Sequence, residues 1–480
     1  MCLLQAEESD YGERMNKLLK GGLAVAGGAV ATEVLRRAIR YEPQPKYDPW
    51  ERVPYTEFTN RVLIVGGGFA GYTVAKTLGD LTEDRDDVGV MVINKENFFT
   101  YWPMVAGIIS SDVETKNVAQ PLRRALIQFG ASFRRAELEG LDLERKIVTA
   151  SGGLEFPYDH LVLALGADPA FFGIPGVEEH CISMKSLVDA EHIRNRLIER
   201  YEEATLAREE ASETNGEEIP ESKLTFVVIG GGSTGVEIAS ELHSLAHKTL
   251  APDYPNIDPN RVRIILVDSN EEILKELDPA LQRAARRHLE ELEIEVINEV
   301  RAKEVTANCV ILDDDREIEA ENVVWTAGNR ASAKVEELDL PQQGEKGVET
   351  DPYMRVPDRE NVWAIGDCAA NVDKDEEPVP PNAQAAVQEG EALAKNILAT
   401  IDGEELTLFE YKPMGQLVEL GSQFAVNEVM GVKFKGLPAA LFWRAAYLFK
   451  LESPENRARI AADWFLDLFF HPTVTQIRGC

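Results

Sequence analysis

Two apolar runs, each followed directly by glycines, stand out in the hydrophobic pattern of this chain. The first, VLIV, ends at Val65, and the second, FVVI, ends at Ile229. Runs that are apolar at every position are typical of parallel strands buried on both faces of a sheet. Each run leads through its glycines into a segment with the helical period, YTVAKTL in the first case and VEIASELHSLA in the second. The pattern therefore predicts an α/β fold that repeats one strand–turn–helix unit.

The stretch from Glu202 to Lys223 lies between the two units and is highly charged. We expect its first part to continue a helix from Ile193. The rest should form an exposed connector, because Asn215-Gly216 and Pro220 are turn-forming residues.

Beyond Leu408 the pattern changes to a hairpin and then to two apolar helices, Gly436–Lys450 and Glu455–Phe470. Trp443 and Tyr447 suit a membrane interface. In the second helix five apolar residues fall on one face: Ile460, Trp464, Phe465, Leu468 and Phe469. Both helices are too short to span a bilayer, so we expect them to lie in its surface. A dimer contact or a cover for the core remains the alternative.

The formal net charge of −33 at pH 7 disfavours nucleic acid as a partner. The charge is uneven, however, because basic residues outnumber acidic ones in 13–40 and in 431–480. Basic, apolar ends favour contact with a membrane surface. The apolar segment Gly21–Ala31 is short and glycine-rich; it fits a flexible or interfacial leader, with a signal peptide as the weaker interpretation.

Five cysteines are scattered along the chain, at Cys2, Cys181, Cys309, Cys368 and Cys480. None forms a C-x-x-C pair or a zinc-type cluster, so we expect no metal site and no disulfide framework. This pattern indicates a reducing compartment. Together with the apolar C-terminal helices, it predicts a peripheral membrane protein on the cytoplasmic face of the cell membrane.

The glycines have the G-x-G-x-x-G spacing of dinucleotide-binding turns. They are Gly66, Gly68 and Gly71 in the first unit, and Gly230, Gly232 and Gly235 in the second. The first glycine of such a motif makes a tight turn, the second lets the backbone approach a pyrophosphate, and the third lets helix and strand pack closely. Two motifs in the same context predict two Rossmann-like dinucleotide-binding domains.

The residue that ends the second strand of each unit distinguishes the two sites. In the second unit this residue is Asp268, whose carboxylate suits the ribose diol and repels a 2′-phosphate, which favours NAD(H) over NADP(H). In the first unit it is Asn94, followed by Lys95 and Glu96. A neutral amide can still bond ribose hydroxyl groups.

An enzyme that binds NADH beside a second, tightly held dinucleotide is most economically a flavoprotein, because FAD accepts a hydride and passes electrons on. We therefore assign FAD to the first site and NAD(H), as substrate, to the second. The predicted organisation is an N-terminal extension and linker at 1–59, an FAD-binding domain at 60–180 and 329–410, an NAD(H)-binding domain at 181–328, and a membrane-associating region at 411–480.

The chain resembles the two-dinucleotide-binding flavoproteins and, among them, the type II NADH:quinone oxidoreductases. The resemblance runs from Asn60 to the C-terminus. Its markers occur in the expected order: VLIVGGGFAG, ENFFTYWPMV, YDHLVLALGADPAFFGIPGVEEH, FVVIGGGSTGVE, VVWTAGN, VWAIGDCA and PPNAQAAVQEG. The last segment is close to the family signature A-Q-x-A-x-Q-x-G. Independently of the resemblance, Asn382 is placed to cap the helix that begins there.

The resemblance implies roles for individual residues. Asp367 would bond the ribityl chain of the flavin, Glu237 would lie near nicotinamide and flavin, and Gln384 and Gln388 would border a quinone pocket. The last three residues are the catalytic candidates. The expected cofactor-binding residues are Gly66, Gly68, Phe69, Ala70, Gly71, Asn94, Lys95, Gly166, Gly230, Gly232, Gly235, Asp268, Gly328, Gly366, Asp367, Ala383 and Gln384.

The resemblance also implies an activity, NADH:quinone oxidoreduction without proton pumping, with a membrane quinone as acceptor. Three alternatives remain open. A sulfide:quinone oxidoreductase would need cysteines beside the flavin, and Cys181 and Cys368 do not match that pattern. A reductase for a soluble protein and a regulatory flavoprotein are the other two, and a homodimer is compatible with each.

Overall fold

A computed structural model of the chain describes residues 53–214, 219–470 and 472–476. The predicted extension at 1–59 therefore lies outside the described residues except for its last seven positions. The apolar segment Gly21–Ala31 and two of the cysteines, Cys2 and Cys480, also lie outside them.

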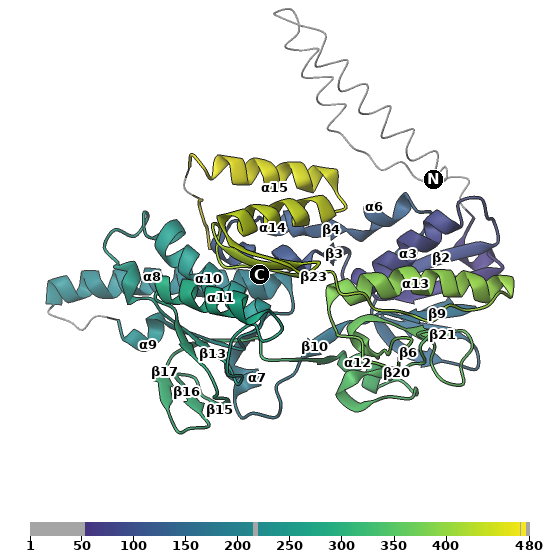
Figure 1. Ribbon diagram of the computed structural model, residues 1–480, viewed down its shortest axis with the longest axis horizontal. Helices are drawn as coiled ribbons and strands as arrows, with labels where there is room; N and C mark the ends of the chain where they lie inside the picture. The colour runs from purple at the N-terminus through teal and green to yellow at the C-terminus, as the bar shows by residue number, and fades with distance from the viewer. Residues whose placement is uncertain (1–52, 215–218, 471, 477–480) are drawn as a thin grey trace, which may run out of the picture. The chain divides into compact units, whose positions relative to one another are not determined.

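The first glycine motif lies in a five-stranded parallel sheet with the order β21-β9-β1-β2-β5 (Figure 1). Along the central strand, alternate residues face opposite layers. Val62 and Ile64 pack among helices, whereas Leu63 and Val65 pack against a small antiparallel sheet. The strands are β1 (Asn60–Val65), β2 (Val88–Asn94), β5 (Ser132–Arg135), β9 (His160–Leu163) and β21 (Val362–Ala364).

Two helices from distant parts of the chain, α3 (Phe69–Leu81) and α13 (Ala383–Asp402), pack against each other beside this sheet. The helix α6 (Leu122–Ile127) contributes to the same layer. The opposite layer is the antiparallel sheet β6 (Leu138–Asp142), β7 (Ile147–Ala150) and β8 (Leu154–Pro157). Layers on both faces explain why β1 is apolar at every inner position.

The second glycine motif lies in an equivalent arrangement. Its parallel sheet has the order β11-β18-β12-β13-β14, with helices on one face and an antiparallel three-stranded sheet on the other. The strands are β11 (Cys181–Ser183), β18 (Asn322–Trp325), β12 (Thr225–Ile229), β13 (Arg263–Val267) and β14 (Glu295–Ile297); the helices are α8 (Leu187–Thr214), α10 (Ser233–Ser244) and α11 (Pro279–Glu291); the small sheet is β15 (Ala302–Val305), β16 (Cys309–Leu312) and β17 (Glu317–Glu319). The predicted α/β fold with two Rossmann-like domains is confirmed.

Short elements connect these layers. An antiparallel ribbon, β10 (Ala167–Pro169) with β19 (Asn329–Ala331), joins the two sheets along the chain. The remaining short strands are β3 (Phe98–Thr100), β4 (Ala119–Pro121), β20 (Val348–Glu349) and β22 (Ala369–Ala370), and the short helices are α4 (Gly107–Ser110), α5 (Thr115–Val118), α7 (Val177–His180), α9 (Glu221–Leu224) and α12 (Ala333–Glu336).

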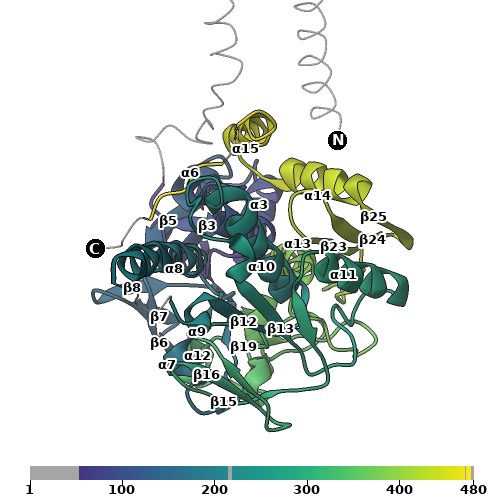
Figure 2. The same ribbon diagram turned by 90° about the vertical axis from the view of Figure 1, so that its left-hand side faces the viewer.

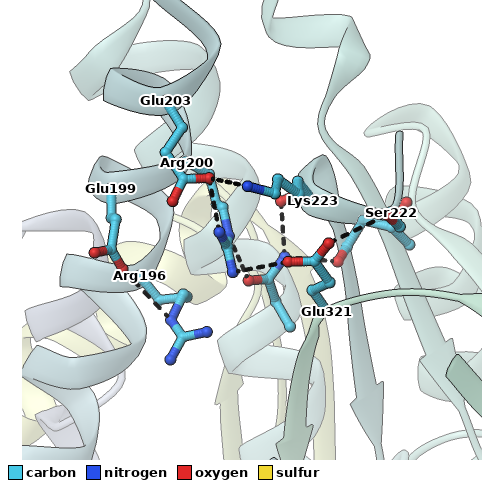
Figure 3. A network of polar contacts seen from close by, with 9 residues as sticks. Arg196, Glu199, Arg200, Glu203, Ser222, Lys223 and Glu321 are labelled. Atoms are coloured by element: carbon cyan, nitrogen blue, oxygen red, sulfur yellow. Dashed lines mark hydrogen bonds and ion pairs between the residues drawn. The ribbon is translucent and has the colours of Figure 1, made fainter. Parts of the chain in front are cut away.

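The charged stretch from Glu202 onwards continues a helix, as expected, but it is not exposed along its whole length. Helix α8 begins at Leu187, earlier than predicted, and Ala204 and Ile219 are buried. Figure 3 shows a polar network that anchors it, in which buried Arg200 pairs with Glu203 at 2.8 Å and with Glu321 at 3.3 Å. Tertiary contacts therefore bury part of a segment whose charged composition favours exposure to solvent.

The C-terminal region forms the predicted hairpin and two helices, extended by a third strand (Figures 1 and 2). Its elements are β23 (Gly415–Glu419), β24 (Ala425–Val429), β25 (Val432–Gly436), α14 (Leu437–Lys450) and α15 (Pro454–Leu466). Helix α15 ends at Leu466 rather than at Phe470. No helix among the described residues is long and apolar enough to cross a bilayer.

The expected orientation of these helices was wrong for four residues. Trp443 and Ile460 are buried in the main core, and Tyr447 and Trp464 pack against it. Tyr447 stacks edge-on against Tyr101 of the first domain, with ring centroids 6.3 Å apart. Helical periodicity identified an apolar face but not what covers it. The exposed apolar residues here are Leu437, Leu441, Phe442, Phe449, Phe465, Leu466, Leu468, Phe469 and Phe470.

Candidate functional site

The first glycine turn is tight at its ends and open in its middle. Gly66 has φ +110°, and a Cβ on Gly71 would overlap the carbonyl oxygen of Gly66. A Cβ on Gly68 would meet no atom within 4 Å. Helix α3 starts directly after Gly68, and no side chain caps its first amides. Uncapped amides that face open space form a cradle for an anion.

The second glycine turn repeats this geometry. Gly230 has φ +117°, and a Cβ on Gly235 would overlap the carbonyl oxygen of Gly230. Gly232 again has open space around it, and α10 begins after it without a side-chain cap. Thr326 supports the turn from behind, since its hydroxyl donates to the carbonyl oxygens of Ile229 and Gly230 at 3.0 and 3.1 Å. The chain therefore builds the same anion cradle twice.

The strand-end residues also occupy equivalent places. The amide of Gly67 donates to Asn94 Oδ1 at 3.0 Å, and the amide of Gly231 donates to Asp268 Oδ2 at 2.5 Å. The other carboxylate oxygen of Asp268 accepts from the backbone amide of Asn270 at 2.7 Å. Both side chains thus lie at the edge of their cradle, where ribose hydroxyl groups of a dinucleotide belong.

Lys95 does not share this position. Its side chain is exposed, and its carbonyl oxygen accepts from Arg135 Nε at 3.0 Å. Gly166 and Gly328 precede the strands of the ribbon that joins the two sheets, and each follows residues that pack against the first glycine of a turn: Leu165 lies against Gly66, and Ala327 lies against Gly230. Gly166 has φ +72°, and Gly328 lies against the ring of Phe172. For these three residues a role in cofactor binding stays a prediction.

Three segments that are far apart in the sequence meet beside the first cradle. A Cβ on Gly366 would lie 3.2 Å from Ala70 Cβ and 3.9 Å from Ala386 Cβ. Asp367 lies in the short 3-10 turn that follows β21; burial raises the pKa of its carboxyl group, and Lys185 opposes that rise. Phe69 packs edge-on against Phe99, with centroids 4.9 Å apart. Ala383 opens α13 at the same place, and the predicted cap is confirmed, since the Ala385 amide donates to Asn382 Oδ1 at 2.9 Å.

Sequence reasoning missed Glu389, which holds this meeting point together. Its Oε2 accepts from the Gly366 amide at 2.6 Å, and its Oε1 accepts from Asn371 Nδ2 at 2.9 Å. Burial raises the pKa of Glu389 to about 7. The available signal was a glutamate on the apolar face of α13, four residues after Ala385 and four before Leu393. Lys185 was missed as well; it is a half-buried lysine within electrostatic range of Asp367 and Asp168.

Gln384 and Gln388 share one face of α13, as predicted, but both are engaged with backbone. Gln388 exchanges two hydrogen bonds with Lys412, at 2.9 and 3.0 Å. Gln384 Oε1 accepts from the Met414 amide at 2.8 Å and from the Tyr411 hydroxyl at 3.1 Å. The two glutamines therefore fix the segment that leads into β23.

Glu237 lies on the first turns of α10 and is half-buried. Burial raises the pKa of its carboxyl group to about 8, a backbone hydrogen bond from Glu419 lowers it, and neighbouring Glu241 raises it. A carboxyl group in this state carries a proton at neutral pH. It can act as a proton donor close to the second cradle.

The two cradles fit dinucleotides on structural grounds. Each offers uncapped helix amides, open space at its middle glycine and a strand-end side chain with oxygen acceptors. Among the described residues, no group of three or more His, Cys, Asp or Glu side chains could hold a metal ion.

Comparison with known proteins gives consistent results. A family model described as pyridine nucleotide-disulphide oxidoreductase matches residues 60–390. A probable NADH dehydrogenase of Dictyostelium discoideum is 29% identical over 420 residues, which cover 85% of this chain and 90% of the relative. The type II NADH:quinone oxidoreductase Ndh of Mycobacterium tuberculosis is 29% identical over 88% of this chain and 90% of its own length.

Among solved structures, NDH2 of Plasmodium falciparum in complex with NADH has the same fold. The TM-score is 0.76 at 19% identity, and the match covers 85% of this chain and 98% of that one.

Proposed function

The chain belongs to the pyridine nucleotide-disulphide oxidoreductase family, and we propose that it is an NADH:quinone oxidoreductase that uses FAD. The overall reaction converts NADH, a proton and a quinone into NAD⁺ and quinol. One observation carries the proposal: the same open anion cradle occurs at both glycine turns. The relatives named above support quinone as the acceptor.

FAD, when bound at the first cradle, accepts a hydride and passes electrons to a second substrate. The first site holds it through the amides at the start of α3, the side chain of Asn94 and the carboxyl group of Asp367. The second site binds NADH through the amides at the start of α10 and through Asp268. These residues orient the two rings and exclude water, while the cofactor supplies the redox chemistry.

The quinone pocket is proposed beside the start of α13. Gln384 and Gln388 fix the segment 411–415 there. Because β23 starts at Gly415 and ends at Glu419, this segment leads directly to the carboxyl groups near α10. Glu237 is the proposed acid on the α10 side.

Membrane docking through α14 and α15 is the finer part of the proposal. Phe442, Phe449, Phe465 and Phe469 are 42–74% exposed. Exposed basic residues accompany them, including Lys435, Lys450 and Arg459. Such a surface suits the interface of an anionic membrane, from which an apolar quinone enters, and we place it on the cytoplasmic face. A second copy of the chain is the alternative occupant.

The cysteines argue against a sulfide:quinone oxidoreductase. Burial raises the pKa of both Cys181 and Cys368 to about 12, so both thiols stay protonated. Protonated thiols are poor nucleophiles for sulfur transfer. Cys368 is fully buried and accepts a hydrogen bond from the Leu165 amide at 3.2 Å.

The direct experiment compares acceptors with the purified full chain. We expect bound FAD, steady-state NADH oxidation with a short-chain quinone, and little turnover with a soluble redox protein. Purified, folded protein without flavin would refute the proposal. Turnover with the soluble protein only would favour the alternative reductase.

A further inference from the structure

A cluster of ionisable side chains is centred on Arg444 of α14. The guanidinium donates from Nη2 to both oxygens of Asp112, at 3.0 and 2.9 Å. Its Nε lies 3.5 Å from Glu419 Oε1 at the end of β23. Trp464 of α15 donates to the same Asp112 at 3.1 Å, and the guanidinium lies 4.7 Å from the centre of the Trp464 ring. Arg444 therefore joins four separate parts of the fold.

Two further carboxyl groups, Glu237 and Glu241, face this cluster from α10. They are one helical turn apart, so they share a face. The Glu237 carboxyl group accepts a hydrogen bond from the backbone of Glu419. The Glu241 carboxyl group is hydrogen-bonded to Ser110 and lies within electrostatic range of Asp112 and Arg444. Glu241 and Glu419 are only 5% and 7% exposed.

The other charged and titratable groups around the cluster do not balance its charge. Lys248, beyond the end of α10, is exposed and bonds Ser422 at 3.2 Å. Asp467, which follows α15, is a further acidic group within electrostatic range of Asp112 and Arg444, and Asp463 of α15 lies near Asp467. Burial raises the pKa of Tyr447, so its hydroxyl stays neutral.

The carboxyl groups of the cluster therefore cannot all be ionised at the same time. Four carboxyl groups, those of Asp112, Glu237, Glu241 and Glu419, share one guanidinium group. If all were ionised, the site would hold three uncompensated negative charges, and two of the four carboxylates, those of Glu241 and Glu419, would be buried, which is strongly unfavourable. Asp112 forms the shorter ion pair with Arg444, at 2.9 Å, and Glu419 the longer one, at 3.5 Å. Burial raises the pKa of Glu241 to about 7 and that of Glu419 well above its ordinary value.

Quinone chemistry needs a proton at this place. NADH delivers two electrons and one proton as a hydride, whereas conversion of a quinone to quinol takes two electrons and two protons. One further proton per turnover must therefore reach the quinone, and an acid of the protein can supply it and then regain it from the solvent. The five-residue strand β23 links the segment held by Gln384 to Glu419, so the proposed quinone pocket and the cluster lie at the two ends of one strand.

We propose that Glu241 and Glu419 hold the proton that Glu237 transfers to the quinone oxygen, and that Arg444 is the fixed counter-charge of this store. The inference rests on the proposed quinone reductase function. In each turnover the O–H bond of the Glu237 carboxyl group breaks and an O–H bond of the quinol forms. Glu237 then recovers a proton from the other two carboxyl groups, which are replenished from water.

The test uses the FAD-loaded full chain with Glu241→Gln, Glu419→Gln and, as a matched control, the exposed Glu405→Gln. NADH oxidation is measured against pH with a quinone and with ferricyanide, which takes electrons without protons. We expect the parent quinone rate to fall as pH rises through about 7 to 8. In the two cluster variants the ratio of quinone to ferricyanide turnover should fall about tenfold or more, and the fall of the quinone rate above neutral pH should diminish.

A second readout does not depend on turnover. At neutral pH the infrared carbonyl band of protonated carboxylic acids should lose intensity in Glu241→Gln and in Glu419→Gln, but not in Glu405→Gln. An unchanged band or an unchanged ratio of turnover in both variants overturns the inference. If the parent reduces ferricyanide but no quinone, the proposed function itself fails, and the infrared band still decides whether the cluster holds protons.

Discussion

The two middle glycines allow a test that separates the two nucleotide sites. Gly68 and Gly232 have φ values of −78° and −73°, which any residue adopts, and a Cβ on either would meet no protein atom within 4 Å. Replacement by alanine therefore puts a methyl group into the space that a pyrophosphate would occupy. The protein itself loses little, because alanine in place of glycine at a helix N-cap costs at most about 1 kcal/mol.

The loss of binding should be larger than the loss of stability. A methyl group that displaces the pyrophosphate from one helix amide removes a charge-assisted hydrogen bond worth about 1.5–3 kcal/mol. At 1.4 kcal/mol for each factor of ten, the nucleotide should bind about ten- to a hundredfold more weakly. Gly68→Ala should lower the flavin content after gel filtration. Gly232→Ala should keep its flavin and raise the dissociation constant for NADH.

The controls lie in the same chain. Gly140→Ala, in β6, places a Cβ in ordinary contact 3.9 Å from Thr149 and should change neither nucleotide. Gly71→Ala and Gly235→Ala would overlap a carbonyl oxygen and should unfold their domains instead. If Gly68→Ala and Gly232→Ala both bound flavin and NADH as tightly as the parent, the assignment of the two cradles would be wrong.

Three further predictions concern other parts of the molecule. Asp268→Asn removes a charge that repels a 2′-phosphate, so the ratio of kcat/KM for NADPH to that for NADH should rise about tenfold; an unchanged ratio would exclude Asp268 from the ribose site. Glu389→Gln tests the pH dependence of stability. Burial raises the pKa of Glu389 from about 4.3 in the unfolded chain to about 7 in the folded protein. The protonated carboxyl group therefore contributes its full stabilisation below about pH 4.3, and this contribution is lost as the pH rises through about 7. Thermal unfolding across that range should show a smaller decline for the variant than for the parent. Phe465→Glu should reduce co-sedimentation with anionic vesicles more than tenfold, because burial of a phenylalanine contributes about 1.5–3 kcal/mol; Leu206→Glu, exposed on α8, is the control, and equal effects of the two would exclude specific docking.

The sequence alone determined the features that depend on local chemistry. The two glycine motifs, their strands and their helices follow from residue types at short spacing, because a tight turn, an open cradle and a close helix each require glycine at one position. The strand-end Asp268 and the helix cap Asn382 were found for the same reason. The absence of a C-x-x-C pair also needed nothing beyond the sequence.

The partners that the apolar and charged residues meet depend on long-range packing. Helical periodicity placed Trp443 and Ile460 on apolar helix faces that we expected to contact a membrane. Both residues instead pack in the main hydrophobic core. Arg444 and Asp112 are an ion pair across 332 positions, and Asn371 reaches Glu389 from another element. The local sequence pattern predicts whether a residue is buried or exposed, but not which residues it will contact. The energy of burial and pairing depends on neighbours that long-range folding brings together.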